Sequence, residues 1–303
     1  MPAKPPLLML VEQPELFGVD HVGERYDLRY QPGPGITAAI TGMNGVDAAT
    51  IDATPDLEMI ALTVVGYDKV DLAHARAKGI TITNTPDVLT DDVADLAIGL
   101  MIAVARRLPA QDMYVRQGRW EKEGTPPLSR RASGRRIGVL GLGRIGQAIA
   151  ARAKPFASEI AYFSRHPREE GADYRYADSP VALAQWADVL IVAVAGGSET
   201  AGLVDRQVIE AVGPEGTLIN IARGSVVDEP AMIAALVDGR LGAAGLDVFA
   251  HEPHVPEALR SLPNVVLIPH QGSATRETRA AMGQLALDNL AAFFAGKPLL
   301  TPI

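Results

Sequence analysis

The middle of the chain reads Arg136-Ile137-Gly138-Val139-Leu140-Gly141-Leu142-Gly143-Arg144-Ile145-Gly146. An aliphatic strand therefore runs into the spacing G-x-G-x-x-G, and a helical run follows it. In such a unit Gly141 permits the tight turn, Gly143 lets the backbone approach a pyrophosphate, and Gly146 lets the helix pack closely on the strand. The first amides of the helix face the anion. Three glycines alone can form an ordinary turn, but the strand before them and the helix after them predict a dinucleotide-binding unit.

Short aliphatic runs alternate with segments of helical period along the rest of the chain. The strand candidates are 6–12, 60–65, 80–84, 136–140, 159–163, 188–194, 217–221, 243–248 and 264–268. This alternation predicts an α/β fold with parallel sheets and helices on both faces. Long helices are expected over 90–107 and about 276–296. The segment 125–136 is rich in Pro, Ser and Arg and indicates a join between domains, or the entry into a second one.

Composition and charge exclude several classes of protein. The 303 residues, 48% apolar and 21% charged, predict a folded protein of two domains or one large α/β domain. The absence of cysteine excludes disulfides, catalytic thiols and thiolate metal sites, and fits a reducing compartment. A net charge of −8 disfavours nucleic acid or an anionic membrane as partner, and the longest apolar run, 96–105, is too short to span a membrane. We expect a cytoplasmic enzyme or binding protein.

The strand after the glycine loop ends in Ser164-Arg165-His166-Pro167-Arg168. Many NAD sites carry an acidic residue near this point, which hydrogen-bonds the adenosine ribose, but here no carboxylate stands before Glu169. An arginine suits a 2′-phosphate, because its planar fork pairs with phosphate oxygens, and Ser164 can add a hydroxyl. Alternatively, the arginines could be solvated charges at the end of the strand, with no role in cofactor binding. The residues predict NADPH as cofactor, with NADH as the weaker alternative.

Three charged residues follow successive strand candidates in the second half of the chain. Arg223 follows 217–221, Glu252 follows 243–248 and His270 follows 264–268. Ligands of open α/β sheets bind outside the carboxyl ends of the strands, so all three point to one crevice. There an arginine can hold a carboxylate, a histidine can donate a proton, and a carboxylate beside that histidine favours its protonated form. Taken singly, Arg223 could pair with Asp228, Glu252 could cap a turn, and His270 could be a structural histidine.

Taken together, these motifs resemble the D-isomer-specific 2-hydroxyacid dehydrogenase family over almost the whole chain. The resemblance includes residues 65–71 and 84–95, the glycine loop, and the Arg, Glu and His motifs. Within the family it is similar to glyoxylate/hydroxypyruvate reductases, notably a plant cytosolic type that also takes aromatic 2-oxo acids. The stretches 162–165, 205–208, 252–256 and 296–302 carry that similarity.

The resemblance implies roles for individual residues. It assigns Arg223, Glu252 and His270 as the active-site arginine, the supporting glutamate and the proton donor. The substrate would meet Val65 and Gly66 as well as Arg223 and His270. The implied cofactor contacts are Thr90, Gly141, Gly143, Arg144, Ile145, Gly146, Ser164, Arg165, Arg168, Ile221, Asp247 and Gly272, with Asp247 at the nicotinamide carboxamide. The remaining histidines have no metal-ligand spacing, and no metal is expected.

The resemblance also implies nested domains. A flavodoxin-like substrate domain would comprise 1–100 and 284–303, and the dinucleotide-binding domain 101–283 would be inserted into it. The segment 125–136 then becomes a connector inside the cofactor domain. Trp120 would lie on a dimerisation arm, either reaching the partner's site or serving as an interface aromatic, and either role implies a homodimer.

Two stretches depart from the family pattern. Residues 193–200 replace a usual Pro-Leu pair beside the adenosine half of the cofactor, and Gln271 replaces an apolar residue. The leading hypothesis is NADPH-dependent reduction of a small anionic 2-oxo acid: glyoxylate to glycolate or hydroxypyruvate to D-glycerate. The alternatives are another D-2-hydroxyacid dehydrogenase, acting for example on aromatic or branched 2-oxo acids, and a dinucleotide-sensing protein similar to a corepressor.

Overall fold

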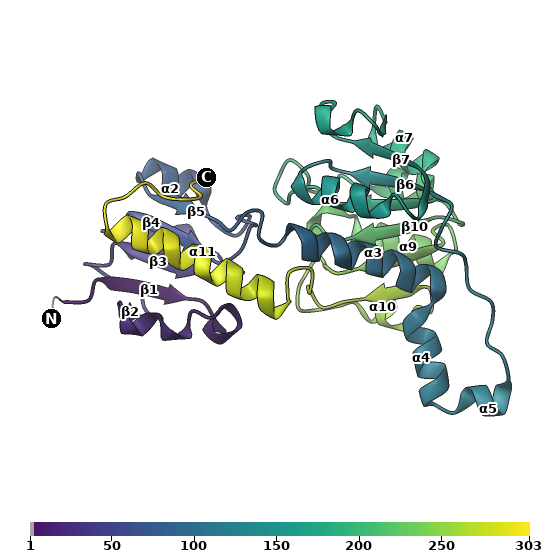
Figure 1. The fold of residues 1–303 in the computed structure, drawn as a ribbon, viewed down its shortest axis with the longest axis horizontal. Coiled ribbons are helices and arrows are strands. Elements are labelled where there is room, and N and C mark those ends of the chain that lie inside the picture. The colour runs from purple at the N-terminus through teal and green to yellow at the C-terminus, as the bar shows by residue number, and fades with distance from the viewer. Residues whose placement is uncertain (1–2) are drawn as a thin grey trace. The chain divides into compact units, whose positions relative to one another are not determined.

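A computed structural model describes residues 3–303, which form two compact units (Figure 1). One unit comprises the chain up to Leu89 together with Ser273–Ile303, and the other comprises Thr90–Gly272. Both units are built on parallel sheets with helices, so the predicted α/β fold is confirmed.

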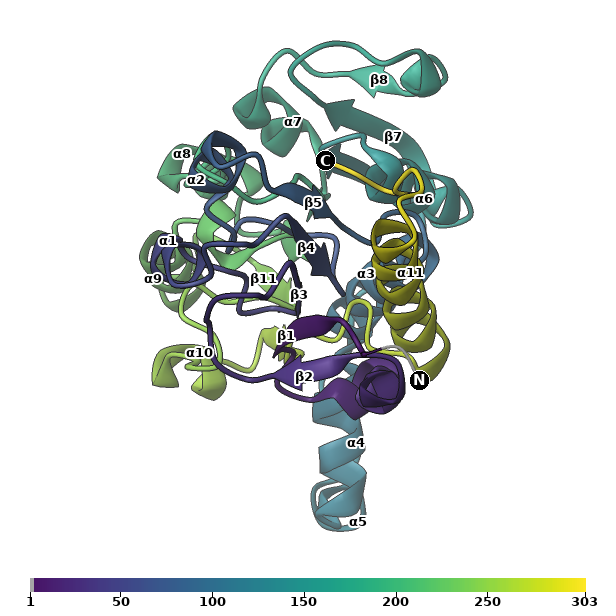
Figure 2. The same cartoon turned by 90° about the vertical axis from the view of Figure 1, so that its left-hand side faces the viewer.

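The first unit contains a sheet of five strands in the order β2-β1-β3-β4-β5, all parallel. The strands are β1 (Pro6–Leu10), β2 (Asp27–Arg29), β3 (Ala38–Thr41), β4 (Met59–Leu62) and β5 (Thr81–Thr83). The helices α1 (Ala48–Asp52) and α2 (Leu72–Ala77) lie on one face and α11 (Arg276–Phe294) on the other (Figure 2). Two short 3-10 segments, Pro14–Phe17 and Asp20–Glu24, follow β1. This strand order is that of flavodoxin-like sheets.

The second unit contains a sheet of seven parallel strands in the order β12-β11-β10-β9-β6-β7-β8. Its strands are β6 (Arg135–Leu140), β7 (Ala157–Phe163), β8 (Arg175–Tyr176), β9 (Val189–Val192), β10 (Thr217–Asn220), β11 (Ala243–Leu246) and β12 (Val265–Leu267). The chain starts at β6, builds outward to β8, and then crosses back to β9 on the other side of β6. That reversal is the topological switch point at which doubly wound sheets bind ligands.

Helices cover both faces of the second sheet. Its helices are α3 (Thr90–Arg106), α4 (Leu108–Arg116), α5 (Arg119–Glu123), α6 (Arg144–Ala153), α7 (Pro180–Trp186), α8 (Arg206–Val212), α9 (Glu229–Val237) and α10 (Glu257–Ser261). On one face α3 packs against α6, and on the other α8 packs against α9 (Figure 2). Side-chain caps fix where several of these helices begin, as where Asp205 accepts from Val208 N and Asp228 from Ala231 N.

All nine expected strands are present, most with shorter bounds, and the two long helices end one or two residues earlier than expected. The expectation missed three short strands. β2 and β8 have only three and two residues and are partly charged, and the buried β3 has the sequence Ala-Ala-Ile-Thr, in which small residues weaken the strand signal. The segment between α5 and β6 has no regular structure.

The two units meet along the chain at 89/90 and 272/273, whereas the expected boundaries were near 100 and 284. Both expected positions fall inside a helix. All of α3 belongs to the second unit, where it packs on α6, β10, β11 and β12, and all of α11 belongs to the first, where it packs on β4. Within residues 3–303, no helix combines the length and apolar character that a membrane crossing requires.

Two helical glycines form a matched pair for testing the packing. A Cβ at Gly283 in α11 would lie 1.7 Å from the carbonyl oxygen of Phe17, whereas a Cβ at Gly99 in α3 would meet nothing within 4 Å. We expect Gly283→Ala to destabilise the protein by about 1–3 kcal/mol, and Gly99→Ala to stabilise it by roughly 0.5–1 kcal/mol. Thermal unfolding followed by circular dichroism measures both. Equal effects of the two substitutions would contradict the close approach of α11 to Phe17.

Candidate functional site

The carboxyl ends of six strands of the second unit lie side by side. The parallel registers align Phe163, Leu140, Val192, Asn220, Leu246 and Leu267 across neighbouring strands. The residues of this unit that the sequence assigned to the substrate or the cofactor, apart from Thr90, lie in the segments that follow members of this row. Thr90 is the first residue of α3. We call this edge of the sheet the carboxyl edge.

The glycine loop joins β6 to α6 at the centre of the carboxyl edge. Gly141 has φ of +100°, which favours glycine, and a Cβ there would also meet Ala193 and Val194 at about 3 Å. A Cβ at Gly146 would lie 1.9 Å from the carbonyl oxygen of Gly141, so the helix touches the loop backbone. Gly143 is the N-cap of α6 and has open space around its Cβ position. This open helix start, with Arg144 and Ile145 in its first turn, fits a dinucleotide pyrophosphate.

The end of β7 carries the residues expected at the adenosine end of the cofactor. Arg165 Nη1 lies 2.7 Å from Glu199 Oε2, and both side chains are largely exposed. The Ser164 hydroxyl donates to the carbonyl of His166 at 2.5 Å, and Arg168 N donates to the Tyr162 hydroxyl at 3.0 Å. Glu199 is a partner that the sequence did not indicate, since it stands 34 residues away. The turn thus presents Arg165 beside the glycine loop, paired with a carboxylate that a phosphate would compete with.

Arg223 follows β10 and is held by its neighbours. The buried Asn220 donates from Nδ2 to the Arg223 carbonyl at 3.0 Å and accepts from Ala222 N at 3.0 Å, which fixes the turn. A Cβ at Gly196 would lie 2.6 Å from Arg223 Cγ, so the loop after β9 packs against the arginine side chain. The stretch 193–200, whose sequence departs from the family pattern, therefore contacts Arg223. Asp228, the alternative partner considered for this arginine, uses its carboxylate to cap α9.

Glu252 and His270 are directly hydrogen-bonded. His270 Nδ1 lies 2.7 Å from Glu252 Oε2, while Glu252 Oε1 accepts from Phe249 N at 2.9 Å. Burial alone would raise the pKa of Glu252, but the bonds from His270 and Phe249 and the charges of His270 and Arg223 together hold it below its usual value. Glu252 is therefore ionised at neutral pH beside the imidazole, which the sequence pattern anticipated.

The backbone of His270 is unusual and is fixed by Asp247. His270 has φ of +53°, a conformation that costs a non-glycine residue free energy and clusters at functional sites. Its amide donates to the carbonyl of Asp247 at 2.8 Å. The Asp247 carboxylate accepts from Gln271 N at 2.6 Å and from Gly272 N at 2.9 Å. Burial, opposed by these two bonds, raises the pKa of Asp247. Asp247 thus shapes the turn that presents His270, in addition to the cofactor contact expected of it.

Other residues expected at the site belong to the first unit or have structural roles in the second. Val65 and Gly66 belong to the first unit, in the loop after β4, where the carbonyl of Val65 accepts from Asn84 Nδ2 at 2.9 Å. Ile221 is buried directly after β10. The side chain of Gln271 donates to the carbonyl of Pro269 at 3.0 Å. Among residues 3–303 no group of three or more His, Asp or Glu side chains is placed to bind a metal ion.

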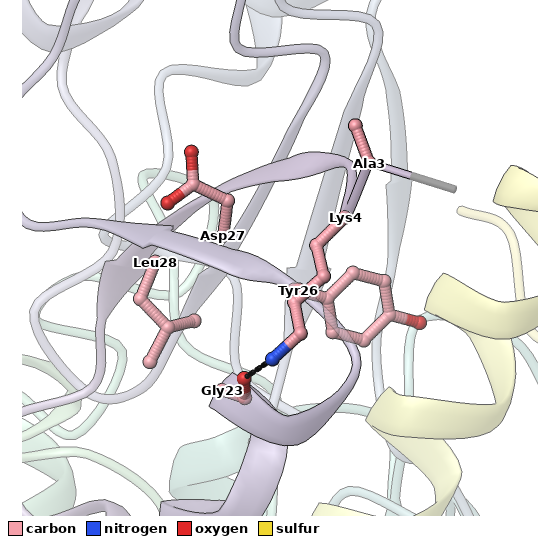
Figure 3. A pocket seen from close by; sticks show the side chains of 6 residues that line it. All are labelled: Ala3, Lys4, Gly23, Tyr26, Asp27 and Leu28. Carbon is pink, nitrogen blue, oxygen red and sulfur yellow. Dashed lines mark hydrogen bonds between the residues drawn. The ribbon is translucent and has the colours of Figure 1, made fainter. Parts of the chain in front are cut away.

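Sequence reasoning missed Asn220, although a buried polar residue at the end of an apolar strand is a usable signal. Two surface hollows are lined by none of the expected site residues. One, of about 520 Å³ in the first unit, is lined by Lys4, Tyr26 and Asp27, and Lys4 Nζ there donates to the carbonyl of Gly23 (Figure 3). The other, of about 350 Å³, lies at the amino ends of β10, β11 and β12.

Comparison with known proteins identifies a matching family and similar enzymes. Residues 98–272 match the family model of the D-isomer specific 2-hydroxyacid dehydrogenase NAD binding domain. The chain is 54% identical to hydroxyphenylpyruvate reductase of Plectranthus scutellarioides, over 88% of this chain and 85% of that one. It is also 54% identical to glyoxylate/hydroxypyruvate reductase A of Arabidopsis thaliana, over 86% and 82% of the two chains.

Among solved structures, the NADPH-dependent glyoxylate/hydroxypyruvate reductase of Sinorhizobium meliloti in complex with NADP and malonate is similar, with a TM-score of 0.94 and 43% identity. The match covers 99% of this chain and 97% of that one. With a family model that spans more than half of the chain, and relatives this similar over most of their length, the chain belongs to the D-isomer specific 2-hydroxyacid dehydrogenase family of NAD(P)-dependent oxidoreductases.

Proposed function

We propose that this enzyme reduces small 2-oxo acids with NADPH, converting glyoxylate to glycolate and hydroxypyruvate to D-glycerate. The observation that carries the proposal is the 2.7 Å bond between Glu252 and His270, on the same sheet edge as Arg223 and the glycine loop. Proteins named as reductases of these acids are similar to the chain over most of its length, which supports the choice of substrates.

The reduction requires the chain to bind the substrate carboxylate, polarise the carbonyl and donate a proton. The Arg223 guanidinium pairs with the substrate carboxylate and draws electron density from the adjacent carbonyl. His270, hydrogen-bonded to ionised Glu252, donates a proton to the carbonyl oxygen as that oxygen becomes a hydroxyl. The backbone of Val65 and Gly66 would contact the same carboxylate. The neutral imidazole then regains a proton from solvent.

The cofactor fits the residues that the carboxyl edge presents. The glycine loop with Arg144 and Ile145 would hold the pyrophosphate, and Ser164, Arg165 and Arg168 the 2′-phosphate. Further contacts would come from Thr90, Ile221, Asp247 and Gly272. Bound NADPH supplies the hydride that the carbonyl carbon receives. The relative that was solved with NADP supports the preference for NADPH over NADH.

A second candidate substrate class is aromatic 2-oxo acids. One relative, 54% identical, is named hydroxyphenylpyruvate reductase, which favours this alternative within the same chemistry. Arg223, Glu252 and His270 would act identically on such a substrate. The corepressor-like alternative has less support, because the similar proteins described above are reductases.

We also infer a homodimer that works in the cytoplasm. The arm formed by α4 and α5 exposes large apolar side chains, a composition typical of interfaces. They are Leu108, Met113, Val115 and Trp120, with Leu128 in the segment after them. Of the two roles considered for Trp120, we propose that it is an interface aromatic and does not reach the partner's site. The lack of cysteine fits a reducing compartment.

The first test is turnover and its dependence on His270. We expect NADPH oxidation with glyoxylate or hydroxypyruvate, followed at 340 nm. His270→Asn should lower kcat by roughly 10²–10⁴-fold, because the proton donor is lost. Asparagine is the suitable replacement since it tolerates the left-handed backbone of this position. NADPH affinity, measured by calorimetry, should stay close to that of the wild type.

Two results would contradict this part of the proposal. If the wild type turns over none of glyoxylate, hydroxypyruvate and hydroxyphenylpyruvate, the assigned reaction is wrong. If His270→Asn retains wild-type kcat, His270 is not the proton donor.

The second test concerns the cofactor phosphate. We expect the double substitution Arg165→Ala and Arg168→Ala to raise KM for NADPH by about 10- to 100-fold, as for the loss of ~1.5–3 kcal/mol of charge-assisted hydrogen bonding. KM for NADH should change little, because NADH lacks the 2′-phosphate. Arg260→Ala, at an exposed arginine in α10, is the control. Equal losses with both cofactors would refute the assignment.

The third test uses pH. Glu252 has a lowered pKa and is ionised across the neutral range, so its charge stabilises the protonated imidazole that reduction needs. Glu252→Gln removes that charge. The alkaline fall of kcat/KM for reduction should then occur at lower pH than in the wild type, because the protonated form loses its negatively charged neighbour. Initial rates between pH 5 and 10, taken with saturating NADPH, give the profile. An alkaline limb at the same pH in Glu252→Gln and wild type would contradict the role of Glu252 beside His270.

A further inference from the structure

We propose that Glu229 is a positioning residue for the reduction, because its buried carboxylate holds the loop 249–252 in the conformation that turns Glu252 toward His270. This inference rests on the proposed function and assigns a role to a residue other than Arg223, Glu252 and His270. Glu229 acts through this loop and is not itself a catalytic residue.

Glu229 is buried although it is charged. It is the first residue of α9 and is only 7% exposed, and its Oε2 accepts from Ala250 N at 3.1 Å. A glutamate in the first helical turn interacts favourably with the helix dipole even when it faces solvent. Burial adds a desolvation cost that an exposed glutamate would avoid. The hydrogen bond from Ala250 N to the Glu229 carboxylate offsets part of this desolvation cost.

Two consecutive amides of the loop bind two different carboxylates. Phe249 N donates to Glu252 Oε1 at 2.9 Å, and Ala250 N donates to Glu229. The other oxygen of Glu252 faces His270 at 2.7 Å. The Glu252 carboxylate is therefore set between its own loop and the imidazole, and Glu229 fixes the peptide that joins Phe249 to Ala250.

The same peptide is also held from the side of Arg223. A Cβ at Gly224 would lie 1.9 Å from the Phe249 carbonyl carbon and 2.4 Å from Ala250 N, so the two backbones are in direct contact. The segment 224–229 therefore supports the loop twice, at Gly224 by packing and at Glu229 by a hydrogen bond. Buried Val226 and Val227 anchor this segment, and Asp228 N donates to the carbonyl of Val204 at 3.0 Å.

A shared support has a consequence for catalysis. Arg223 directly precedes the segment 224–229 and Glu229 ends it, so the residue that orients the substrate and the loop that carries Glu252 are fixed relative to each other. Without an acceptor at position 229, the Ala250 amide must turn toward water or another acceptor. The loop then shifts, and Glu252 no longer forms its 2.7 Å hydrogen bond with His270.

The experiment compares Glu229→Gln and Glu229→Ala with Glu277→Ala, a first-turn glutamate of α11 that is exposed. Glutamine keeps an oxygen acceptor for Ala250, so we expect kcat within about threefold of the wild type and an unchanged pH profile. Glu229→Ala should lower kcat roughly 10- to 100-fold and move the alkaline limb of kcat/KM to lower pH, as in Glu252→Gln. KM for NADPH should be unchanged in all three variants.

A double-mutant cycle separates positioning from a general loss of structure. In the Glu252→Gln background, Glu229→Ala should lower kcat by less than about threefold, because the carboxylate that it positions is already gone. Thermal unfolding and NADPH affinity confirm that each variant is folded at the assay temperature. If Glu229→Ala fails to fold, Glu229→Asp, which shortens the reach to Ala250, replaces it in the same cycle with the same expected loss.

The inference is overturned if the alanine variant keeps the wild-type kcat and pH profile, or if it lowers kcat by the same factor in both backgrounds. It is also overturned if Glu229→Gln loses as much activity as Glu229→Ala. Failure of the proposed function has a different signature, since the wild type itself would then show no turnover with the 2-oxo acids.

Discussion

The parallel register of the seven-stranded sheet is the constraint on which the site depends. It sets Leu140, Val192, Asn220, Leu246 and Leu267 in one row, so each strand delivers its next residues to the same edge. Parallel strands need long crossovers, here mostly helices, which return the chain to the opposite edge each time. Functional residues that are far apart in sequence are therefore brought together by the backbone hydrogen bonds of the sheet.

Three carboxylates near this edge have different structural roles. Asp247 and Glu229 are nearly fully buried and accept backbone amides, so they shape the loops. Glu252 gives one oxygen to an amide and the other to His270. Burial raises the pKa of Asp247, whereas the neighbouring charges and hydrogen bonds lower that of Glu252. This divergence keeps a negative charge beside the imidazole, as acid–base pairs require.

The sequence predicted the parts of this arrangement that have a local signature. The glycine spacing and the charged residues after aliphatic runs each lie within a few neighbouring residues, and the strands they imply are present. Contacts between distant segments have no such signature. The pairing of Arg165 with Glu199 and the bond from Ala250 to Glu229 depend on how loops from different strands meet. Glu229 in particular has the sequence appearance of an ordinary first-turn glutamate, and only its burial distinguishes it.

Backbone contacts set the spacing of the loops at two places. Gly146 touches the carbonyl of Gly141, and Gly224 touches the peptide of Phe249, so these loops meet at van der Waals contact with no side chain between them. In the proposed reaction Arg223, Glu252 and His270 then act on the 2-oxo acid group, which glyoxylate, hydroxypyruvate and aromatic substrates share. Selection among these acids must come from residues that contact the remainder of the substrate, where each methylene contributes only about 1–3 kcal/mol. One rigid reductive centre is therefore compatible with several substrates in related enzymes.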